Sequence, residues 1–296
     1  MKAKGIGSFQ LLDGRACSEA LKGVIAHEAA AVTARRGRAP HLAAVLVGED
    51  GASRTYVEAK VKACAAVGFR STLVQLPGST TEAELLERIQ GLNQDPGLDG
   101  FIVQLPLPKH ISADRITLAI RPEKDVDGFH PVNIGNMVLG HDGFLPATPS
   151  GVCELLKHFG IETDGRHCVV VGRSHIVGTP MSILMSRNAE PGNCTVTLAH
   201  SRTRDLSSIT RQADILIVAA GKPGMIGAAM VKEGAVVVDV GIHRIKDESR
   251  ASGFRLVGDV RFDEVAPKCA WISPVPGGVG PMTITSLLLN TLKAAR

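Results

Sequence analysis

One lysine stands on a face of a predicted helix that should be buried. The stretch TYVEAKVKACAAVG has helical periodicity, and Tyr56 and Lys60, four residues apart, share one face of the helix. The same face continues through Ala63, Cys64 and Val67, which are apolar. Tyr56 is the only tyrosine of the chain. Since it shares this face with Lys60, an aromatic ring and an amine are expected side by side at one site.

Lys60 has two interpretations. It could be a surface lysine that lays its stem along apolar residues. Alternatively, burial lowers the pKa of the amine and makes it a proton carrier near neutral pH. The second interpretation needs a polar partner, and Gln104, at the end of the apolar segment GFIVQLP, could hold the amine without adding charge. Lys62 lies four residues after Glu58, which is the spacing of a solvated ion pair.

Two further segments could complete this site. Asp127 lies in PEKDVDGFHP, where the Asp-Gly pair is typical of a turn, but the loop follows the Gln104 strand and could fold over the same crevice. The segment ISPVPGGVGPMTI places two prolines around Gly-Gly-Val-Gly, and Pro281 suits the first turn of a final helix. Such a loop, poor in side chains, would let a flat ligand lie against backbone.

A second pattern, in the C-terminal half, predicts a dinucleotide site. In VVVGRSHIVGTP an apolar strand, a glycine turn and a helix start follow one another, which suits phosphate binding. The spacing is G-x5-G, so the turn alone is a weak signal. The next strand ends in His200, Ser201 and Arg202, with Arg173 in the first turn. Hydroxyl and guanidinium groups suit a 2′-phosphate, which a carboxylate would repel, so we expect NADP.

The elements that position these residues alternate along the chain. We expect a helix over 14–36, then strands at 42–47, 71–76 and 100–106 around a helix at 81–93. Two prolines near 145–151 predict a hinge. A second series follows, with strands at 167–172, 195–201, 214–221 and 235–241 and a helix at 178–188. This pattern predicts two doubly wound α/β domains around a cleft, the C-terminal one of Rossmann type.

Composition excludes several other classes of protein. The net charge of +4, without a block of like charge, and 3% aromatic residues disfavour nucleic-acid binding. No secretory signal and no membrane span are expected, and six cysteines without C-x-x-C spacing indicate reduced, buried thiols of a cytoplasmic protein. Gly221-Lys222 begins like the end of a phosphate-binding P-loop, but Pro223 stands where Ser or Thr would hold a metal ion. We predict no metal site.

Six segments follow one another along the chain: TYVEAKVKAC, GFIVQLPLP, PEKDVDGFHPVNIG, VVVGRSHIVGTP, TVTLAHSRT and SPVPGGVGPMT. With these segments in this order, essentially the whole chain resembles the bifunctional methylenetetrahydrofolate dehydrogenase/methenyltetrahydrofolate cyclohydrolase family (FolD type). The resemblance implies oxidation of 5,10-methylenetetrahydrofolate by NADP⁺, hydrolysis to 10-formyltetrahydrofolate, a place in purine biosynthesis, and a homodimer formed through the cofactor domain. It implies a folate domain at 1–146 completed by 276–296, and an NADP domain at 147–275.

The resemblance also implies roles for single residues. Lys60 would transfer the proton in hydrolysis, Gln104 would position it, Tyr56 would stack on the folate, and Asp127 would bind the pterin N–H edge. The remaining folate contacts and the cofactor contacts would come from strand ends and loops. These are Val103, Leu105, Pro276, Gly277 and Gly278 for folate, and Gly172, Arg173, Ser174, Ile176, Ser201, Arg202 and Ile242 for NADP.

Four features depart from the family pattern: Gly51, Ala147, Ala199 and an insertion around 189–193. None of them removes a predicted catalytic residue. Three other functions stay open at this point: another NADP oxidoreductase such as a shikimate-dehydrogenase-like enzyme, a folate- or nucleotide-binding protein without catalysis, and a dehydrogenase that lacks the hydrolysis. The set of Lys60, Gln104 and Asp127 argues against all three.

Overall fold

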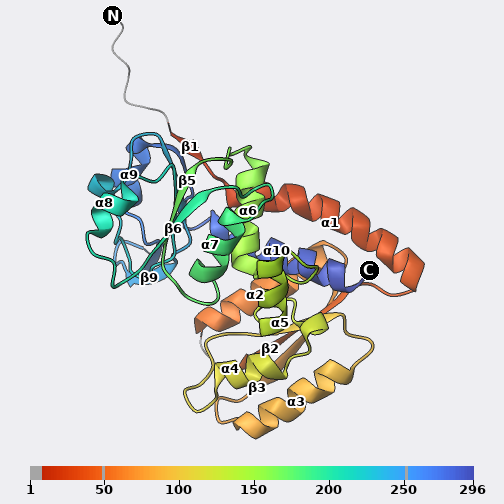
Figure 1. Ribbon diagram of the computed structural model, residues 1–296. Coiled ribbons are helices and arrows are strands. Elements are labelled where there is room, and N and C mark those ends of the chain that lie inside the picture. The colour runs from red at the N-terminus through yellow and green to blue at the C-terminus, as the bar shows by residue number, and fades with distance from the viewer. Residues whose placement is uncertain (1–8, 49–50, 251–252) are drawn as a thin grey trace, which may run out of the picture. The chain divides into compact units, whose positions relative to one another are not determined.

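Strands and helices alternate along the chain, and in the computed structural model they fall into two units (Figure 1). The structure describes residues 9–48, 51–250 and 253–296. One unit, here the three-stranded unit, comprises Glu19–Ala147 and Ile284–Arg296. The other, the six-stranded unit, comprises Thr148–Thr283 and the chain up to Ser18. The domain boundaries that we predict after residues 146 and 275 stay a prediction.

The three-stranded unit has a parallel sheet in the order β3-β2-β4. Neighbouring residues of β2 point to opposite faces, so Leu42 and Ala44 enter one apolar core while Ala43 and Val45 enter another. Helices cover both faces, as predicted. The elements are β2 (His41–Val47), α2 (Gly51–Ala66), β3 (Arg70–Leu76), α3 (Glu82–Gln94), β4 (Gly100–Val103), α4 (Ala113–Ala119), η1 (Pro122–Lys124) and α5 (Pro131–Leu139).

The six-stranded unit has a parallel sheet in the order β1-β11-β8-β7-β5-β6, and β9 and β10 pair as an antiparallel hairpin. Alternation of β5, β7 and β8 with helices gives the predicted Rossmann-type arrangement. The strands are β1 (Gln10–Leu11), β5 (His167–Val171), β6 (Thr195–Ala199), β7 (Ile215–Val218), β8 (Ala235–Asp239), β9 (His243–Lys246), β10 (Phe254–Val257) and β11 (Cys269–Ile272). The helices are α6 (Ala147–His158), α7 (Gly178–Ser186), α8 (Leu206–Thr210), η2 (Ala228–Met230), α9 (Phe262–Val265) and η3 (Ala266–Lys268).

Two long helices, α1 (Gly14–Arg36) and α10 (Val279–Ala294), each begin in the six-stranded unit and continue in the three-stranded unit. Helix α1 has the predicted bounds. Helix α3 begins after the cap residue Thr81, where Thr81 and Glu84 exchange hydrogen bonds between side chain and backbone. Pro281 lies in the first turn of α10, as its missing N–H allows.

Several predictions about local structure were wrong. The strand predicted at 100–106 ends at Val103, because Pro106 and Pro108 cannot donate to a sheet. The hinge predicted near 145–151 coincides with the boundary between the two units at Ala147 and Thr148, but these residues form the start of α6 and not an irregular linker, since a proline in the first turn of a helix removes no helical hydrogen bond. Strands β1, β9, β10 and β11 were missed; β1 has two residues, β9 alternates half-buried and exposed side chains, and β10 is exposed at its first three residues, so neither β9 nor β10 has a buried face.

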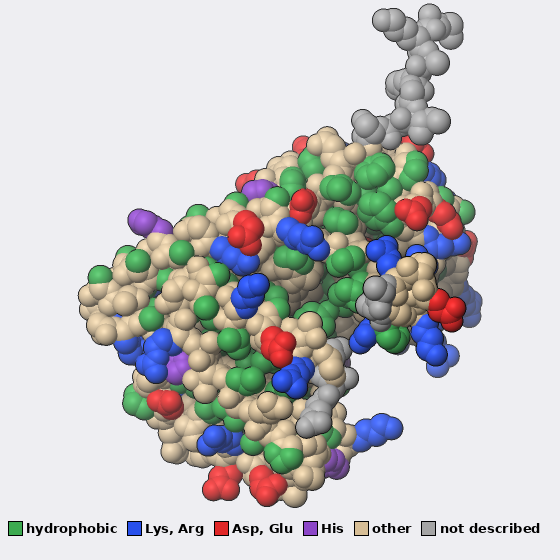
Figure 2. All heavy atoms as spheres, turned by 180° about the vertical axis from the view of Figure 1, so that it is seen from behind, with side chains coloured by type: hydrophobic (Ala, Val, Ile, Leu, Met, Phe, Trp, Pro, Cys, Tyr) green, Lys and Arg blue, Asp and Glu red, His purple; other side chains and the backbone are tan. Residues whose placement is uncertain are grey.

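The surface and the cysteines agree with the composition. On the face drawn in Figure 2, acidic and basic side chains are interspersed. All six cysteines are free and buried, as predicted. Among the described residues, no helix is long and apolar enough to cross a membrane. The segment predicted to lack a secretory signal includes residues 1–8, which lie outside the described residues.

Candidate active site

The lysine of the predicted buried face is buried. Lys60 lies on α2 with 8% of its surface exposed, and the same face carries the buried side chains of Ala63, Cys64 and Val67. Tyr56, one turn before Lys60, stays 36% exposed at the margin of this face. The outer face differs in detail from the prediction, because Glu58 pairs with Arg54 at 3.0 Å instead of with the following lysine.

Gln104 is the polar partner of Lys60. The Lys60 Nζ donates a hydrogen bond to Gln104 Oε1 at 3.0 Å. The other end of the same amide is fixed, because Gln104 Nε2 donates to the carbonyl oxygen of Leu105 at 2.7 Å. A carbonyl oxygen can only accept, so the amide must turn its own oxygen toward the lysine. The Gln104 backbone N–H donates to the Val45 oxygen at 2.8 Å and anchors the residue to the sheet.

Burial shifts the pKa values of Lys60, Asp127 and Tyr56 away from their ordinary values. It lowers the pKa of the Lys60 amine, and the nearby Asp127 carboxylate opposes this change. It raises the pKa of Asp127, which the Lys60 charge in turn opposes. It also raises the pKa of the Tyr56 hydroxyl. Lys60 and Asp127 therefore act on each other electrostatically, and each is destabilised in its charged form by the loss of water.

Asp127 belongs to a loop that the protein holds at several points. Asp125, two residues earlier, is buried, and its carboxylate accepts from His130 N at 2.7 Å and from Asn133 Nδ2 at 2.9 Å. Asn290 of α10 donates to the carbonyl oxygen of Val126 at 2.8 Å. Burial raises the pKa of Asp125 to about 6. Sequence reasoning missed these bracing residues, although the repeated aspartates of KDVDG were visible.

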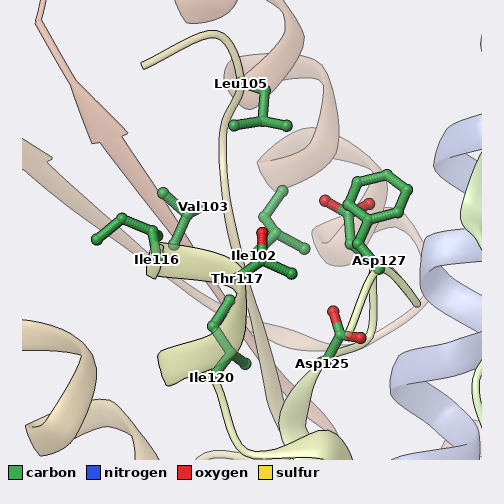
Figure 3. Close-up of a pocket in the computed structure, with 9 residues that line it drawn as sticks. Ile102, Val103, Leu105, Ile116, Thr117, Ile120, Asp125 and Asp127 are labelled. Carbon is green, nitrogen blue, oxygen red and sulfur yellow. The ribbon is translucent and has the colours of Figure 1, made fainter. Parts of the chain in front are cut away.

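A small cavity lies beside this loop (Figure 3). Its volume of about 10 Å³ is close to what one water molecule needs. The carboxyl groups of Asp125 and Asp127 lie on one side of it, and Ile116 of α4 and Ile120, directly after that helix, lie on the other. Asp127 is thus next to an apolar region, which accounts for the direction of its pKa shift. The other lining residues are Ile102, Val103, Leu105, Thr117 and Phe129.

The predicted folate loop 276–278 lies in the six-stranded unit, immediately before α10. Its conformation requires glycine, since Gly277 has φ of 115° and a Cβ on Gly278 would lie 2.7 Å from the carbonyl oxygen of Pro274. Pro276 precedes them in the same turn. The contact of these three residues with folate stays a prediction.

The turn after β5 has the geometry of a phosphate-binding turn. Gly172 has φ of 120°, and a Cβ on Gly178 would lie 2.0 Å from the Gly172 carbonyl oxygen, so both positions exclude larger residues. Ser174 Oγ accepts from the N–H groups of Val177 and Gly178 at 3.2 and 3.4 Å. The start of α7 is therefore held close to the backbone of Gly172. A fixed glycine turn before a helix start is the arrangement that binds a pyrophosphate.

Basic and hydroxyl side chains surround this turn, as the sequence predicts. Arg173 and Ser174 are exposed in the turn itself, and Ser201 and Arg202 are exposed after β6. Since β5 and β6 are parallel neighbours, these two strand ends meet at one edge of the sheet. Ile176 and Ile242 are 41% and 43% exposed and leave apolar surface for a ligand.

The insertion at 189–193 precedes β6 and does not belong to the turn at its carboxyl end. It joins α7 to the amino end of β6, whereas Ser201 and Arg202 follow its carboxyl end. Ala199, the other departure near the cofactor residues, is fully buried as the last residue of β6. Neither feature alters the residues that face a ligand after β6.

Comparison with known proteins identifies the family to which the chain belongs. Residues 12–127 match the catalytic domain of tetrahydrofolate dehydrogenase/cyclohydrolase, and residues 146–296 match its NAD(P)-binding domain. The bifunctional protein FolD of Cytophaga hutchinsonii is 64% identical over 97% of this chain and 99% of its own length.

Solved structures give the same result. The bifunctional enzyme FolD from Campylobacter jejuni is 47% identical, with a TM-score of 0.91 over 97% of this chain and 99% of that one. The Trypanosoma brucei N5,N10-methylenetetrahydrofolate dehydrogenase-cyclohydrolase, solved with NADP cofactor and inhibitor, is 40% identical, with a TM-score of 0.92 over 98% of both chains.

Proposed function

We propose a mechanism for this chain, which belongs to the tetrahydrofolate dehydrogenase/cyclohydrolase family. The chain is a bifunctional enzyme that oxidises 5,10-methylenetetrahydrofolate with NADP⁺ and hydrolyses the product, 5,10-methenyltetrahydrofolate, to 10-formyltetrahydrofolate. The observation that carries the mechanism is the buried Lys60 amine, held at 3.0 Å by a glutamine whose orientation is fixed.

The residues at the carboxyl ends of β5 and β6 fit NADP. Gly172 and Gly178 let the turn after β5 pack closely on neighbouring backbone, and Arg173, Ser201 and Arg202 supply donors for a 2′-phosphate. Ser174, Ile176 and Ile242 complete the contacts. When bound, NADP⁺ supplies the hydride acceptor. The oxidation needs positioning more than acid catalysis, because the two nitrogens beside the methylene carbon stabilise the cation that forms.

Lys60 carries the proton in the hydrolysis. As a neutral amine, favoured by burial, it accepts a proton from the water that attacks the methenyl carbon. It then returns that proton to N5 of the pterin as the carbon–N5 bond breaks, which leaves the formyl group on N10. The second proton of the overall reaction is released to solvent. Gln104 keeps the amine in one direction through both steps.

The remaining residues of the three-stranded unit bind the substrate. Tyr56 lies one turn before Lys60 at the exposed margin of the buried face and offers an aromatic ring for stacking against the pterin. Asp127 accepts from the N–H edge of the pterin, and its charge balances Lys60 when the amine is protonated. Val103 and Leu105 give the apolar wall.

The setting of the enzyme follows from the family resemblance. We propose that the chain forms a homodimer through the six-stranded unit, works in the cytoplasm and supplies one-carbon units for purine biosynthesis. Light scattering after gel filtration measures the first of these points, since a dimer has a mass near 62 kDa, twice the 31.1 kDa of one chain.

Two absorbance assays test the function. Purified protein with 5,10-methylenetetrahydrofolate and NADP⁺ should form the methenyl chromophore, and protein with methenyltetrahydrofolate alone should consume it. Formation without consumption identifies a monofunctional dehydrogenase. Tight folate binding with neither reaction identifies a binding protein. Neither folate binding nor folate turnover, with oxidation of another substrate by NADP⁺, identifies a different oxidoreductase.

A further inference from the structure

The turn after β7 is an anion-binding turn that the protein fills with its own carboxylate. Three successive backbone N–H groups, those of Ala220, Gly221 and Lys222, donate to the Asp259 carboxylate at 2.7, 2.9 and 2.8 Å. Convergent N–H groups of this kind usually bind phosphate. Asp259 is fully buried, so it occupies the turn from inside the protein. This explains why Gly221-Lys222 resembles a phosphate loop in sequence without being one.

A second buried carboxylate fixes the position of the first. Asp239, at the end of β8, accepts from the N–H groups of Gly241, Asp259 and Val260 at 3.0, 2.9 and 2.9 Å. The two aspartates approach through glycines. A Cβ on Gly241 would lie 2.5 Å from Cγ of Asp259, and one on Gly258 would lie 1.8 Å from Asp239 Oδ2. The arrangement therefore tolerates no side chain at either glycine.

His243 connects this arrangement to the β9–β10 hairpin. Its Nε2 lies 2.7 Å from Asp259 Oδ1, with the imidazole 21% exposed. Because a carboxylate accepts, Nε2 carries the proton and donates. Both neighbours of Ile242 in the chain make hydrogen bonds to these aspartates. The Gly241 N–H donates to Asp239, and the His243 ring donates to Asp259. An exposed isoleucine at the hairpin base is thus fixed on both sides.

This arrangement lies at the edge of the sheet where the cofactor residues lie. Strands β8, β7, β5 and β6 are parallel and adjacent in that order, so their carboxyl ends share one edge. The adenosine ribose of a dinucleotide belongs at the end of the second strand, here β6, and the pyrophosphate at the turn after β5. The nicotinamide half must then extend toward the ends of β7 and β8, where Asp259 fixes the backbone.

We propose that Asp259 is a positioning residue of the cofactor site. By filling the turn after β7 from within, it directs the cofactor's pyrophosphate to the turn after β5, and through His243 it fixes Ile242 against the nicotinamide half. This inference rests on the proposed placement of the cofactor. It concerns the nicotinamide half, which NADP and NAD share, and not the 2′-phosphate that distinguishes them.

Calorimetric titration of the purified enzyme with NADP⁺ and with NAD⁺ tests the proposal. Asp259→Asn replaces one carboxylate oxygen by an amide that cannot accept from the turn. It should weaken both ligands by the same factor, about tenfold, the effect of losing one hydrogen bond to a charged group. His243→Leu should weaken both about threefold, and His243→Gln, which keeps a donor, should restore binding. Asp247→Asn, at the far end of the same hairpin, should change neither.

The outcomes separate this proposal from the placement on which it rests. Arg202→Gln should weaken NADP⁺ and leave NAD⁺ unchanged; if it changes neither, the proposed cofactor placement is wrong. If Arg202→Gln behaves as expected but Asp259→Asn and His243→Leu keep both dissociation constants within about twofold, Asp259 does not position the cofactor. A change in the ratio of NADP⁺ to NAD⁺ affinity on Asp259→Asn also contradicts the proposal. Should Asp259→Asn fail to fold, His243→Leu decides.

Discussion

Replacing Gln104 should move the pH dependence of the hydrolysis in a direction set by the new side chain. Gln104 accepts one hydrogen bond from Lys60 at 3.0 Å. A bond to a charged group contributes about 1.5–3 kcal/mol and a bond between neutral groups about 0.5–1.5 kcal/mol. The bond therefore favours the ammonium form by about 1–1.5 kcal/mol, or roughly one pKa unit. Gln104→Met removes this preference without adding charge, so the pKa of Lys60 falls.

The measurement is the rate of methenyltetrahydrofolate hydrolysis as a function of pH. Since Lys60 must be neutral to accept a proton, the rate rises with pH through the pKa of Lys60. For Gln104→Met this rise should move to lower pH by about one unit. Gln104→Glu places a carboxylate beside the amine, worth up to ~4 kcal/mol at an effective dielectric constant of ~20, and should move it upward by as much as about three units.

The control is Gln90→Met on the exposed side of α3, which should leave the profile unchanged. A rise that stays at the same pH in both folded Gln104 variants would refute the reasoning, because the titrating group would then not be the amine that Gln104 holds. Opposite shifts in the two variants are expected only if that amine sets the rate.

Four further predictions concern stability, the oxidation and folate binding. Gly178→Ala places a Cβ 2.0 Å from the Gly172 oxygen and should abolish oxidation with NADP⁺ while hydrolysis continues. Gly23 lies in the middle of α1, where an added Cβ meets no other atom. Gly23→Ala should therefore stabilise the protein by about 0.5–1 kcal/mol in urea unfolding. Asn290→Leu leaves the buried oxygens of Val126 and Leu145 without their donor and should cost about 2–4 kcal/mol in the same assay, with a raised KM for folate. Burial raises the pKa of Asp239 to about 6 from 3.8, so the folded state binds this proton more tightly and loses about 3 kcal/mol of stability as pH rises from about 4 to 6. Asp239→Asn should flatten that decline in the free energy of unfolding, and an unchanged slope would contradict the assignment.

Much of the site was visible in the sequence because its residues interrupt a pattern. Lys60 was found because a lysine on an apolar helical face has no simple structural reason, and Gln104 because it ends an apolar strand. The turn after β5 was found from two glycines at strand and helix ends. Each of these signals is local, so periodicity and turn chemistry are enough to detect it.

The residues that brace the site were not predictable in the same way. Asn290 contacts a loop more than 160 residues earlier in the chain, and Asp259 fills a turn that lies 37–39 residues before it. Nothing in a single sequence relates such positions, since their pairing depends on which strands become neighbours. Local signals can also mislead. The prolines near 145–151 suggest an irregular linker, but they lie at the start of α6, because a proline that breaks a helix interior is tolerated in a first turn.

The central claim is that Lys60 carries the proton of the hydrolysis and is dispensable for the oxidation. The most direct measurement follows methenyl absorbance with Lys60→Met, supplied first with 5,10-methylenetetrahydrofolate and NADP⁺ and then with methenyltetrahydrofolate alone, beside Lys62→Met as the exposed control on α2. The account predicts that Lys60→Met still forms the methenyl compound and hardly consumes it, while Lys62→Met does both. Hydrolysis by folded Lys60→Met at the wild-type rate would contradict the account.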